Sequence, residues 1–300
     1  MLKIAWSPIY AHPLPEGHRF PMLKYELLPE QLLYEGTATP SNFFTPSPAD
    51  TTTILSTHTK EYWEKLQHLA LSTQEIRKTG FPLSAALVER EITILQGSVQ
   101  GALYALEDGV AMNIAGGTHH AFTDRGEGFC LLNDIAVAAN YLLQNTPIKK
   151  ALVIDLDVHQ GNGTAEIFRD NDQVFTFSMH GEHNYPMHKE KSDWDIGLPD
   201  GTDDTLYLRL LQNALPRLVD EVAPEFVFFQ SGVDILATDK LGKLKVSREG
   251  CKQRDKLVLE MCKKNRIPVV CSMGGGYSEK ITDIVEAHAN TYRLAQEIFF

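Results

Sequence analysis

Short apolar runs that end in polar or glycine-rich residues constrain the fold of this 300-residue chain more than any other feature. The runs alternate with longer stretches in which apolar residues recur every three or four positions. This alternation is typical of a parallel sheet that is covered by helices on both faces. We therefore predict an α/β fold, a three-layer α/β/α sandwich with a central, mostly parallel sheet.

The expected elements follow from this alternation. The predicted strands are Lys3–Ser7, Val110–Ala115, Ala151–Asp157, Val174–Met179, Phe226–Ser231 and Pro268–Met273. The predicted helices are Ser84–Glu107, Ile135–Leu143, Asp204–Val222, Arg248–Asn265 and Glu279–Phe300. The Pro/Thr/Ser-rich stretch Thr37–Thr53 is expected to be a surface loop. No repeat or domain-sized linker is visible, so residues 1–300 are expected to form a single domain.

Charge and cysteine content exclude some classes of function. The formal net charge of −11 argues against direct binding to nucleic acid, which needs clustered Lys and Arg. An acidic chain is expected to attract cationic substrates, although excess carboxylates also serve simply to keep copies of a protein apart. The four cysteines show neither C-x-x-C nor zinc-finger spacing, which indicates reduced, buried thiols.

The sequence also predicts where the protein works. The N-terminal segment MLKIAWSPIYAHPLPEGH has Pro and His where a signal peptide needs an apolar run. No stretch approaches the roughly 20 apolar residues that span a bilayer. We therefore expect a soluble, cytoplasmic protein with no membrane partner, and the sequence leaves its oligomeric state open.

Polar residues follow the predicted strands directly, which locates a site. They occur in the segments NIAGGTHH, LVIDLDVHQGNG, FSMHGEHNYP, FVFFQSGVD and VVCSMGGGY. In parallel α/β sheets, ligands bind beyond the carboxyl ends of the strands. We therefore expect the Asp, His and Tyr side chains of these segments to meet at one edge of the sheet.

Asp155, Asp157 and His159 indicate a metal site. Carboxylates at the end of a buried strand are costly unless each is paired or binds a metal. Alternate residues of a strand project to the same side, about 6.6 Å apart, so two adjacent members of this set can bind one ion. The outer pair, about 13 Å apart in an extended strand, cannot. One carboxylate therefore remains to bind a second cation or to orient a neighbour.

Asp234, just past another predicted strand, is the best candidate for a third ligand, because catalytic zinc sites use three protein ligands. Taken alone, an Asp at this position is more often a helix cap or turn residue. Two carboxylates and one imidazole would neutralise a divalent ion, so such a site also needs a base for water and a donor for an oxyanion. His119 and His120 supply a base, and Tyr277, after three glycines, supplies a donor.

These segments together resemble the histone deacetylase superfamily of zinc-dependent acyl-lysine and acylpolyamine deacetylases. The resemblance is carried by GGTHHAFTDRGEGFCLLND, VIDLDVHQGNGT, SGVDILATDKLG and MGGGY, which occur in the family's order between about residues 110 and 280. The segments DRGEGFC, HQGNG and NYP look closest to the class IV branch and its bacterial relatives. The resemblance implies an arginase-like α/β/α fold that forms one catalytic domain over residues 1–300.

The resemblance implies roles for the metal-site residues. Asp157, His159 and Asp234 would bind Zn²⁺, and the same ligand set also accepts Fe²⁺. Asp155 would support His119 and, with Ser178 and backbone carbonyls, contribute to a structural K⁺ site.

The resemblance also implies roles in catalysis. His120 would act as general base and then general acid, with support from His119, and Tyr277 would donate to the acyl oxygen. Class I members have an Asp where this chain has Asn162, and Asn orients an imidazole without stabilising its charged form.

A substrate tunnel is implied as well. Gly128, Phe129, Leu241 and Gly275 would line it, and Tyr185 is expected to border its entrance. The substrate would be an acylated lysine in a peptide or protein, or an acylated polyamine, and neither the amine nor the acyl length follows from the sequence.

Other patterns carry less weight. His180, His183 and His188 lie in a loop rich in Lys, Glu and Asp, and we interpret them as a solvated rim rather than a second metal site. Two further functions stay open: arginase-type ureohydrolase chemistry, which uses two bridged metals, and a metal-stabilised sensor or scaffold without turnover.

Overall fold

An eight-stranded parallel sheet forms the centre of the molecule in the computed structural model, which describes residues 1–300. Its strand order is β2-β1-β3-β8-β7-β4-β5-β6. The strands are β1 (Lys3–Ala5), β2 (Phe43–Phe44), β3 (Val110–Asn113), β4 (Ala151–Asp155), β5 (Val174–Gly181), β6 (Trp194–Leu198), β7 (Phe226–Gln230) and β8 (Val269–Ser272). β3, β4, β7 and β8 are buried along their whole length, which explains their continuous apolar sequences.

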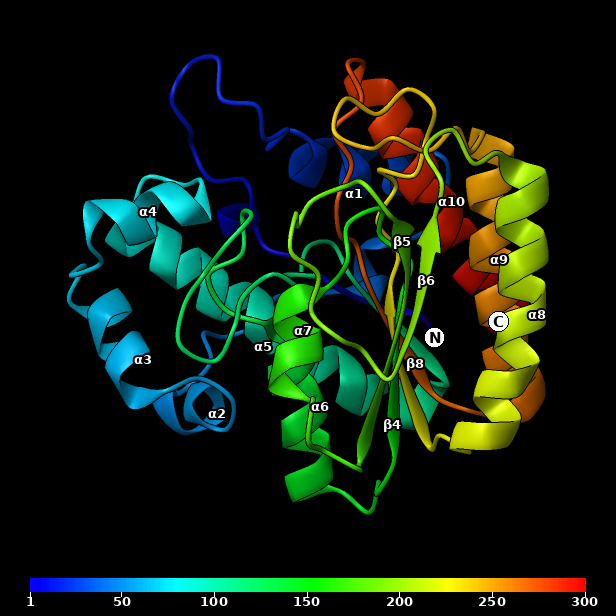
Figure 1. Cartoon of the computed structure of the whole chain (residues 1–300), viewed down its shortest axis with the longest axis horizontal. Coiled ribbons are helices and arrows are strands. Elements are labelled where there is room, and N and C mark those ends of the chain that lie inside the picture. The colour runs from blue at the N-terminus through cyan, green and yellow to red at the C-terminus, as the bar shows by residue number, and fades with distance from the viewer.

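Helices cover both faces of the sheet, so the predicted three-layer α/β/α architecture is confirmed (Figure 1). One layer contains α5 (Ala85–Asp108), α6 (Asp134–Asn145) and the short α7 (Asn162–Ile167). The other contains α1 (Lys24–Tyr34), α8 (Asp204–Val222), α9 (Arg248–Asn265) and α10 (Ile281–Phe299). The small helices α2 (Thr51–Leu55), α3 (Lys60–Gln67) and α4 (Thr73–Thr79) lie beside α5, away from the sheet. Short 3₁₀ helices occupy Pro8–Tyr10 and Pro40–Asn42.

The longest helix begins and ends where its sequence provides caps. The side chain of Ser84 accepts a hydrogen bond from the backbone N–H of Leu87 at the start of α5. Gly109 ends the helix in the left-handed conformation, which lets the chain turn directly into β3. No helix of the chain combines the length and the apolar character that crossing a bilayer requires.

Two edge strands were not predicted. β2 lies inside Thr37–Thr53, so the expectation that this stretch is only a surface loop was wrong. Its two residues are too few for an alternating pattern, and only pairing with β1 makes them a strand. β6 alternates between partly buried and exposed residues and follows a charged loop, which hides the strand in the sequence. α1 was not predicted either, because it contains Pro29.

Candidate metal centre and active site

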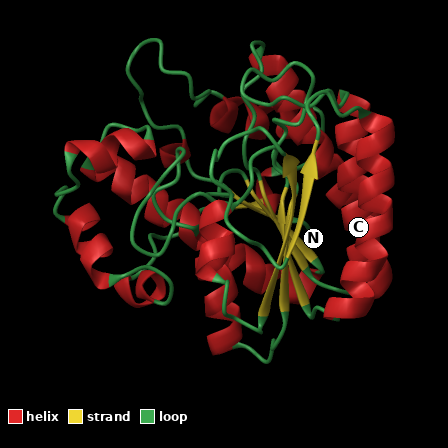
Figure 2. Ribbon diagram, viewed as in Figure 1, coloured by secondary structure: helices red, strands yellow, loops and turns green.

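The loops that follow β3, β4, β7 and β8 meet at one edge of the sheet (Figure 2). They carry His119 and His120, then Asp157 and His159, then Asp234, and finally Tyr277. All strands of the sheet are parallel, so their carboxyl ends share this edge. The structure thus brings together the segments that the sequence placed at one site.

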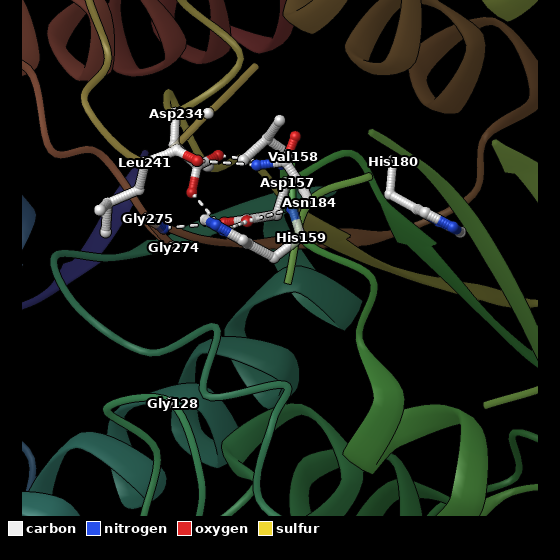
Figure 3. A network of polar contacts seen from close by, with 12 residues as sticks. Gly128, Asp157, Val158, His159, His180, Asn184, Asp234, Leu241, Gly274 and Gly275 are labelled. Carbon is white, nitrogen blue, oxygen red and sulfur yellow. Dashed lines mark hydrogen bonds and ion pairs between the residues drawn. The ribbon is translucent and has the colours of Figure 1, made fainter. Parts of the chain in front are cut away.

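Asp157, His159 and Asp234 form a compact, buried group of metal-ligating side chains (Figure 3). Their ligand atoms lie within 4.8 Å of one another. Nδ1 of His159 is 3.1 Å from Asp157 Oδ1 and 3.1 Å from Asp234 Oδ2. Within the whole chain, this is the only group of three or more His, Cys, Asp or Glu residues with such spacing.

The chain turns after Asp155 instead of remaining extended to Asp157. The backbone N–H of Asp157 donates to Asp155 Oδ1 at 3.2 Å, and that of His159 donates to Asp157 Oδ1 at 3.0 Å. β4 therefore ends two residues earlier than predicted. The extended-strand spacing does not apply beyond Asp155, because side-chain acceptors replace the ladder partners of the backbone.

Two glycines leave the space that the carboxylates occupy. A Cβ on Gly275 would lie 2.1 Å from Asp234 Oδ2, and one on Gly232 would lie 2.1 Å from Asp157 Oδ2. The backbone N–H of Gly275 also donates to Asp157 Oδ2 at 3.0 Å. Any larger residue at either position would displace a carboxylate, so the glycines fix the shape of the site.

The electrostatics of this group favour a bound cation. Burial, together with the charge of Asp157, raises the pKa of Asp234 to about 7. Although burial lowers the pKa of His159, its bonds to the two aspartates raise it to about 10. The two carboxylates therefore stabilise a positive charge at this buried position. Two carboxylates and one imidazole fit Zn²⁺ or Fe²⁺, so the residues present match the predicted metal.

His119 and His120 lie side by side, with ring centroids 4.1 Å apart, but their pKa values shift in opposite directions. Nδ1 of His119 is 2.7 Å from Asp155 Oδ2, and this carboxylate and Asp157 raise the pKa of His119 to about 9 despite its burial. Nδ1 of His120 donates to Asn162 Oδ1 at 2.6 Å. Burial and the neighbouring imidazoles hold the pKa of His120 well below its usual range, so His120 is neutral with Nε2 free to accept a proton.

Tyr277 brings a phenol to the same pocket. Its ring packs 6.0 Å from Phe20, 6.0 Å from Phe129 and 6.4 Å from His159, measured between centroids. Burial and the negative charges of the site keep its pKa well above the usual value, so the hydroxyl is protonated and can donate. The hydroxyl makes no hydrogen bond within the protein.

The predicted tunnel residues lie around one pocket with an inner and an outer part. His119, His120, Asp157, His159, Gly275 and Tyr277 line the inner part, together with Gly128 and Phe129. Tyr185 and Leu241 line the mouth. The ring of Tyr185 stands 4.9 Å from that of His120, between centroids, and its hydroxyl donates to Glu127 Oε2 at 3.1 Å.

Two polar residues lie on β5, behind the metal ligands. Ser178 pairs with Asp155 in the sheet register, and its hydroxyl lies 2.9 Å from His180 Nδ1. His180 is 3% exposed, so the interpretation of this histidine as part of a solvated rim was wrong. It lies at the end of a strand and faces inward, whereas His183 and His188 are exposed as expected.

Two cations of the site region were missed. Lys24 is fully buried, donates to the Gly274 carbonyl at 3.0 Å and lies 5.7 Å above the Tyr277 ring. Arg254 is fully buried below the loops that carry Asp157 and Asp234. Both come from helices, where Lys and Arg are ordinarily solvated, so no pattern in the sequence marks them.

Comparison with known proteins agrees with this site. A model of the "Histone deacetylase domain" family matches residues 18–292. Histone deacetylase 2 of Arabidopsis thaliana is 30% identical over 278 residues, which cover 89% of this chain and 72% of that protein. An uncharacterized protein of Picosynechococcus is 43% identical over 296 residues, which cover 99% of both chains.

A solved structure shows the same fold. The crystal structure of an HDAC homolog from Aquifex aeolicus superposes with a TM-score of 0.84 at 26% identity, covering 98% of this chain and 84% of that chain. A structure of an HDAC homolog complexed with SAHA gives a TM-score of 0.85 at 26% identity, covering 99% and 84%. The fold, the matched family model and the curated relatives agree, and this chain belongs to the histone deacetylase family of hydrolases.

Proposed function

We propose that this chain is a metal-dependent amidohydrolase that removes acyl groups from the ε-amine of lysine or from related amines such as acylated polyamines. The observation that carries the proposal is the pocket itself. Asp157, His159 and Asp234 converge beside a neutral imidazole, His120, and a protonated phenol, Tyr277. A purely structural metal site needs neither of these two groups. The SAHA complex of a homologous protein supports a pocket for acyl-lysine-like molecules.

The metal would be Zn²⁺ or Fe²⁺, held by Asp157, His159 and Asp234. When bound, it would supply Lewis-acid activation of water and of the acyl carbonyl. Asp155, which accepts from Asp157 N–H and pairs with Ser178 across β4 and β5, is the residue we assign to a structural K⁺ site. This potassium assignment is a proposal that follows from the family resemblance.

The chain's own groups would carry the proton transfers. His120 removes a proton from the attacking water at Nε2, because its Nδ1–H is held by Asn162. The same nitrogen then returns the proton to the leaving amine. The Tyr277 hydroxyl donates a hydrogen bond to the acyl oxygen as negative charge develops there. His119, held by Asp155, supplies a positive charge beside the reacting atoms.

Phe129 and Tyr185 would enclose the acyl-lysine chain, with Gly128 and Leu241 completing the wall and Gly275 the floor. We further propose that residues 1–300 act as one catalytic domain. The four free, buried cysteines fit the cytoplasmic location that we propose.

Arginase-type chemistry is the weaker alternative. It needs two bridged metals, and the chain holds one group with metal-ligand spacing. Measuring metal per chain separates the two, because about one equivalent supports the deacylase and two support the ureohydrolase.

The decisive experiment is a panel of acyl-lysine peptides and acetylpolyamines of graded acyl length, assayed with and without a chelator. We expect hydrolysis that disappears when metal is removed. The Tyr277→Phe variant should lose about 10²- to 10³-fold in kcat, as for loss of one oxyanion donor, with unchanged metal content. Tyr34→Phe, at the exposed end of α1, is the matched control. Activity that survives complete metal removal would refute the proposal.

A further inference from the structure

The mouth of the pocket is cationic, although the whole chain carries a formal charge of −11. Arg19, Lys78 and Lys243 line it, together with His183, and no aspartate or glutamate lines it. The local electrostatic field at a pocket affects a substrate more strongly than the net charge of the protein does. The expectation that an acidic chain prefers cationic substrates therefore does not hold at this entrance.

These three cations keep free hydrogen-bond donors. The Arg19 guanidinium makes no hydrogen bond or ion pair and lies 5.0 Å above the Phe129 ring. Lys78 Nζ is 3.8 Å from Glu127, and Lys243 Nζ is 3.9 Å from Asp200, both beyond hydrogen-bond distance. Each lysine side chain is 49% exposed.

The nearby carboxylates have other partners. Glu127 accepts from Arg125 Nε at 3.1 Å and from the Tyr185 hydroxyl at 3.1 Å. Asp200 is 3.3 Å from His183 Nδ1. Neither carboxylate lines the mouth, so an incoming substrate meets the ammonium and guanidinium groups first.

Arg19 stands one aromatic ring away from Tyr277. Phe129 contacts Arg19 on one side and packs 6.0 Å from Tyr277 on the other, between centroids. An acyl-lysine whose amide reaches Tyr277 and His120 would pass Phe129 and present its backbone to Arg19 and Lys243.

We propose that this mouth selects acyl-lysine substrates that carry a carboxylate next to the acylated lysine, which rests on the proposed deacylase function. The carboxylate is either the α-carboxylate of the lysine or an acidic neighbouring side chain, and charge-assisted hydrogen bonds from the three cations recognise it. An acylated polyamine retains ammonium groups and is disfavoured, because like charges would face each other at the rim.

The test compares matched substrates by kcat/KM at low salt. Three acetyl-lysine peptides differ only in flanking Asp, Ala or Lys. A second pair contrasts Nε-acetyl-lysine bearing a free α-carboxylate with its α-amide, which separates the two sources of the carboxylate, and N-acetylputrescine represents the polyamines. We expect kcat/KM to fall from the Asp peptide to the Ala peptide to the Lys peptide, by about 10-fold in total. Each exposed ion pair contributes up to about 5-fold. This span should shrink in 0.5 M salt, because the electrostatic screening length is then about 4 Å.

Charge reversal at the mouth provides the variants. Arg19→Glu combined with Lys243→Glu should invert the order of the Asp and Lys peptides. Arg209→Glu on α8 combined with Lys264→Glu at the end of α9 makes the same total change of charge at exposed positions of the far layer. This double variant is the control and should leave the order unchanged. A wild-type preference for the Lys peptide or for N-acetylputrescine would overturn the proposal. An equal inversion in the control variant Arg209→Glu/Lys264→Glu would also overturn it.

Binding separates this proposal from the proposed function. The Tyr277→Phe protein is titrated with the same peptides, fluorescently labelled, and the Kd values are compared by anisotropy. If the wild type hydrolyses none of the substrates, the deacylase function fails, while the order of Kd values still decides the charge preference of the mouth. Equal Kd values for the Asp and Lys peptides would sink the charge proposal even if hydrolysis is fast.

Discussion

Two buried polar clusters lie close together beneath the carboxyl ends of β4 and β7, and only one of them is complete within the chain. Arg254 from α9 donates to Asp255 at 2.7 Å, to the carbonyls of Leu156 and Gly232, and to that of Ser231 at 3.0 Å. Every branch of its guanidinium therefore has a partner.

The second cluster has an excess of negative charge. Asp155, Asp157 and Asp234 are buried together, and the pKa values of His119 and His159 rise to about 9 and about 10 in response. No guanidinium reaches these carboxylates. The difference teaches that Arg254 holds the backbone of the site in place from below, while the carboxylates above are left to bind an external cation.

Removing the cation of the complete cluster should have the largest effect. Arg254→Met leaves the buried Asp255 with only the Thr291 hydroxyl as a donor and removes the guanidinium donor of three carbonyls. We therefore expect a loss of about 3–5 kcal/mol in the free energy of unfolding, measured by urea denaturation. The double variant Arg254→Met/Asp255→Leu should recover part of this loss, because no charge is then left unpaired. A single variant as stable as the wild type would show that the cluster is not a structural anchor.

His58 provides a neutral counterpart to Arg254, with an effect that depends on pH. It is buried, and its Nε2 accepts from the backbone N–H of Asn133, beside the loop that carries His119 and His120. Burial lowers the pKa of His58 to about 4. Between about pH 6.5 and 4 the unfolded chain binds a proton at this position that the folded chain does not.

The free energy of unfolding should therefore fall as the pH drops through this window, and His58 alone should account for roughly 3 kcal/mol of the fall. The measurement is urea denaturation at several pH values for the wild type and for His58→Gln, whose slope should be flatter in the window. Arg254 stays charged throughout this window, so its own titration adds nothing to the slope. Identical slopes for the wild type and His58→Gln would contradict the assignment.

Without metal, the incomplete cluster should lose much less stability on substitution. Asp234→Asn removes a negative charge that burial and the neighbouring Asp157 already disfavour. The amide oxygen can still accept a hydrogen bond from the backbone N–H of Val158. We expect the metal-free protein to keep its stability within about 1 kcal/mol. The gain on adding Zn²⁺, about 2.7 kcal/mol at a metal concentration of 100 Kd, should disappear. Thermal melts with and without metal check this, and a metal-free variant as damaged as Arg254→Met would break the comparison.

Lys24 should have the smallest effect, because it only partly balances the second cluster. Its buried ammonium, whose pKa burial lowers to about 8, interacts with Asp234 and Asp157. Lys24→Met should strengthen metal binding by roughly fivefold, about 1 kcal/mol, since a competing cation is removed. Competition with a chelator measures the affinity, with Lys264→Met at the exposed end of α9 as control. Weaker binding in Lys24→Met would show that the ammonium organises the ligands instead of competing with the metal.

Local pattern was sufficient to predict much of the fold and the ligand set. The buried strands β3, β4, β7 and β8 were predicted because their apolar runs are long enough to recognise, and their polar endings marked one edge of the sheet. Asp157, His159 and Asp234 were chosen because carboxylates and an imidazole at that edge need a cation. β2 was missed because it has only two residues, and β6 because the exposed residues of an edge strand interrupt its apolar pattern.

The sequence by itself determined the layered α/β architecture and the kinds of side chain that gather at the strand ends, because both follow from periodicity along the chain. Tertiary structure alone decided that Arg254 and Lys24 are buried, that His180 faces inward, and that Arg19, Lys78 and Lys243 surround the mouth. These residues come from segments far apart in the sequence. Their environment depends on which surfaces the fold brings together, and no local pattern encodes that contact.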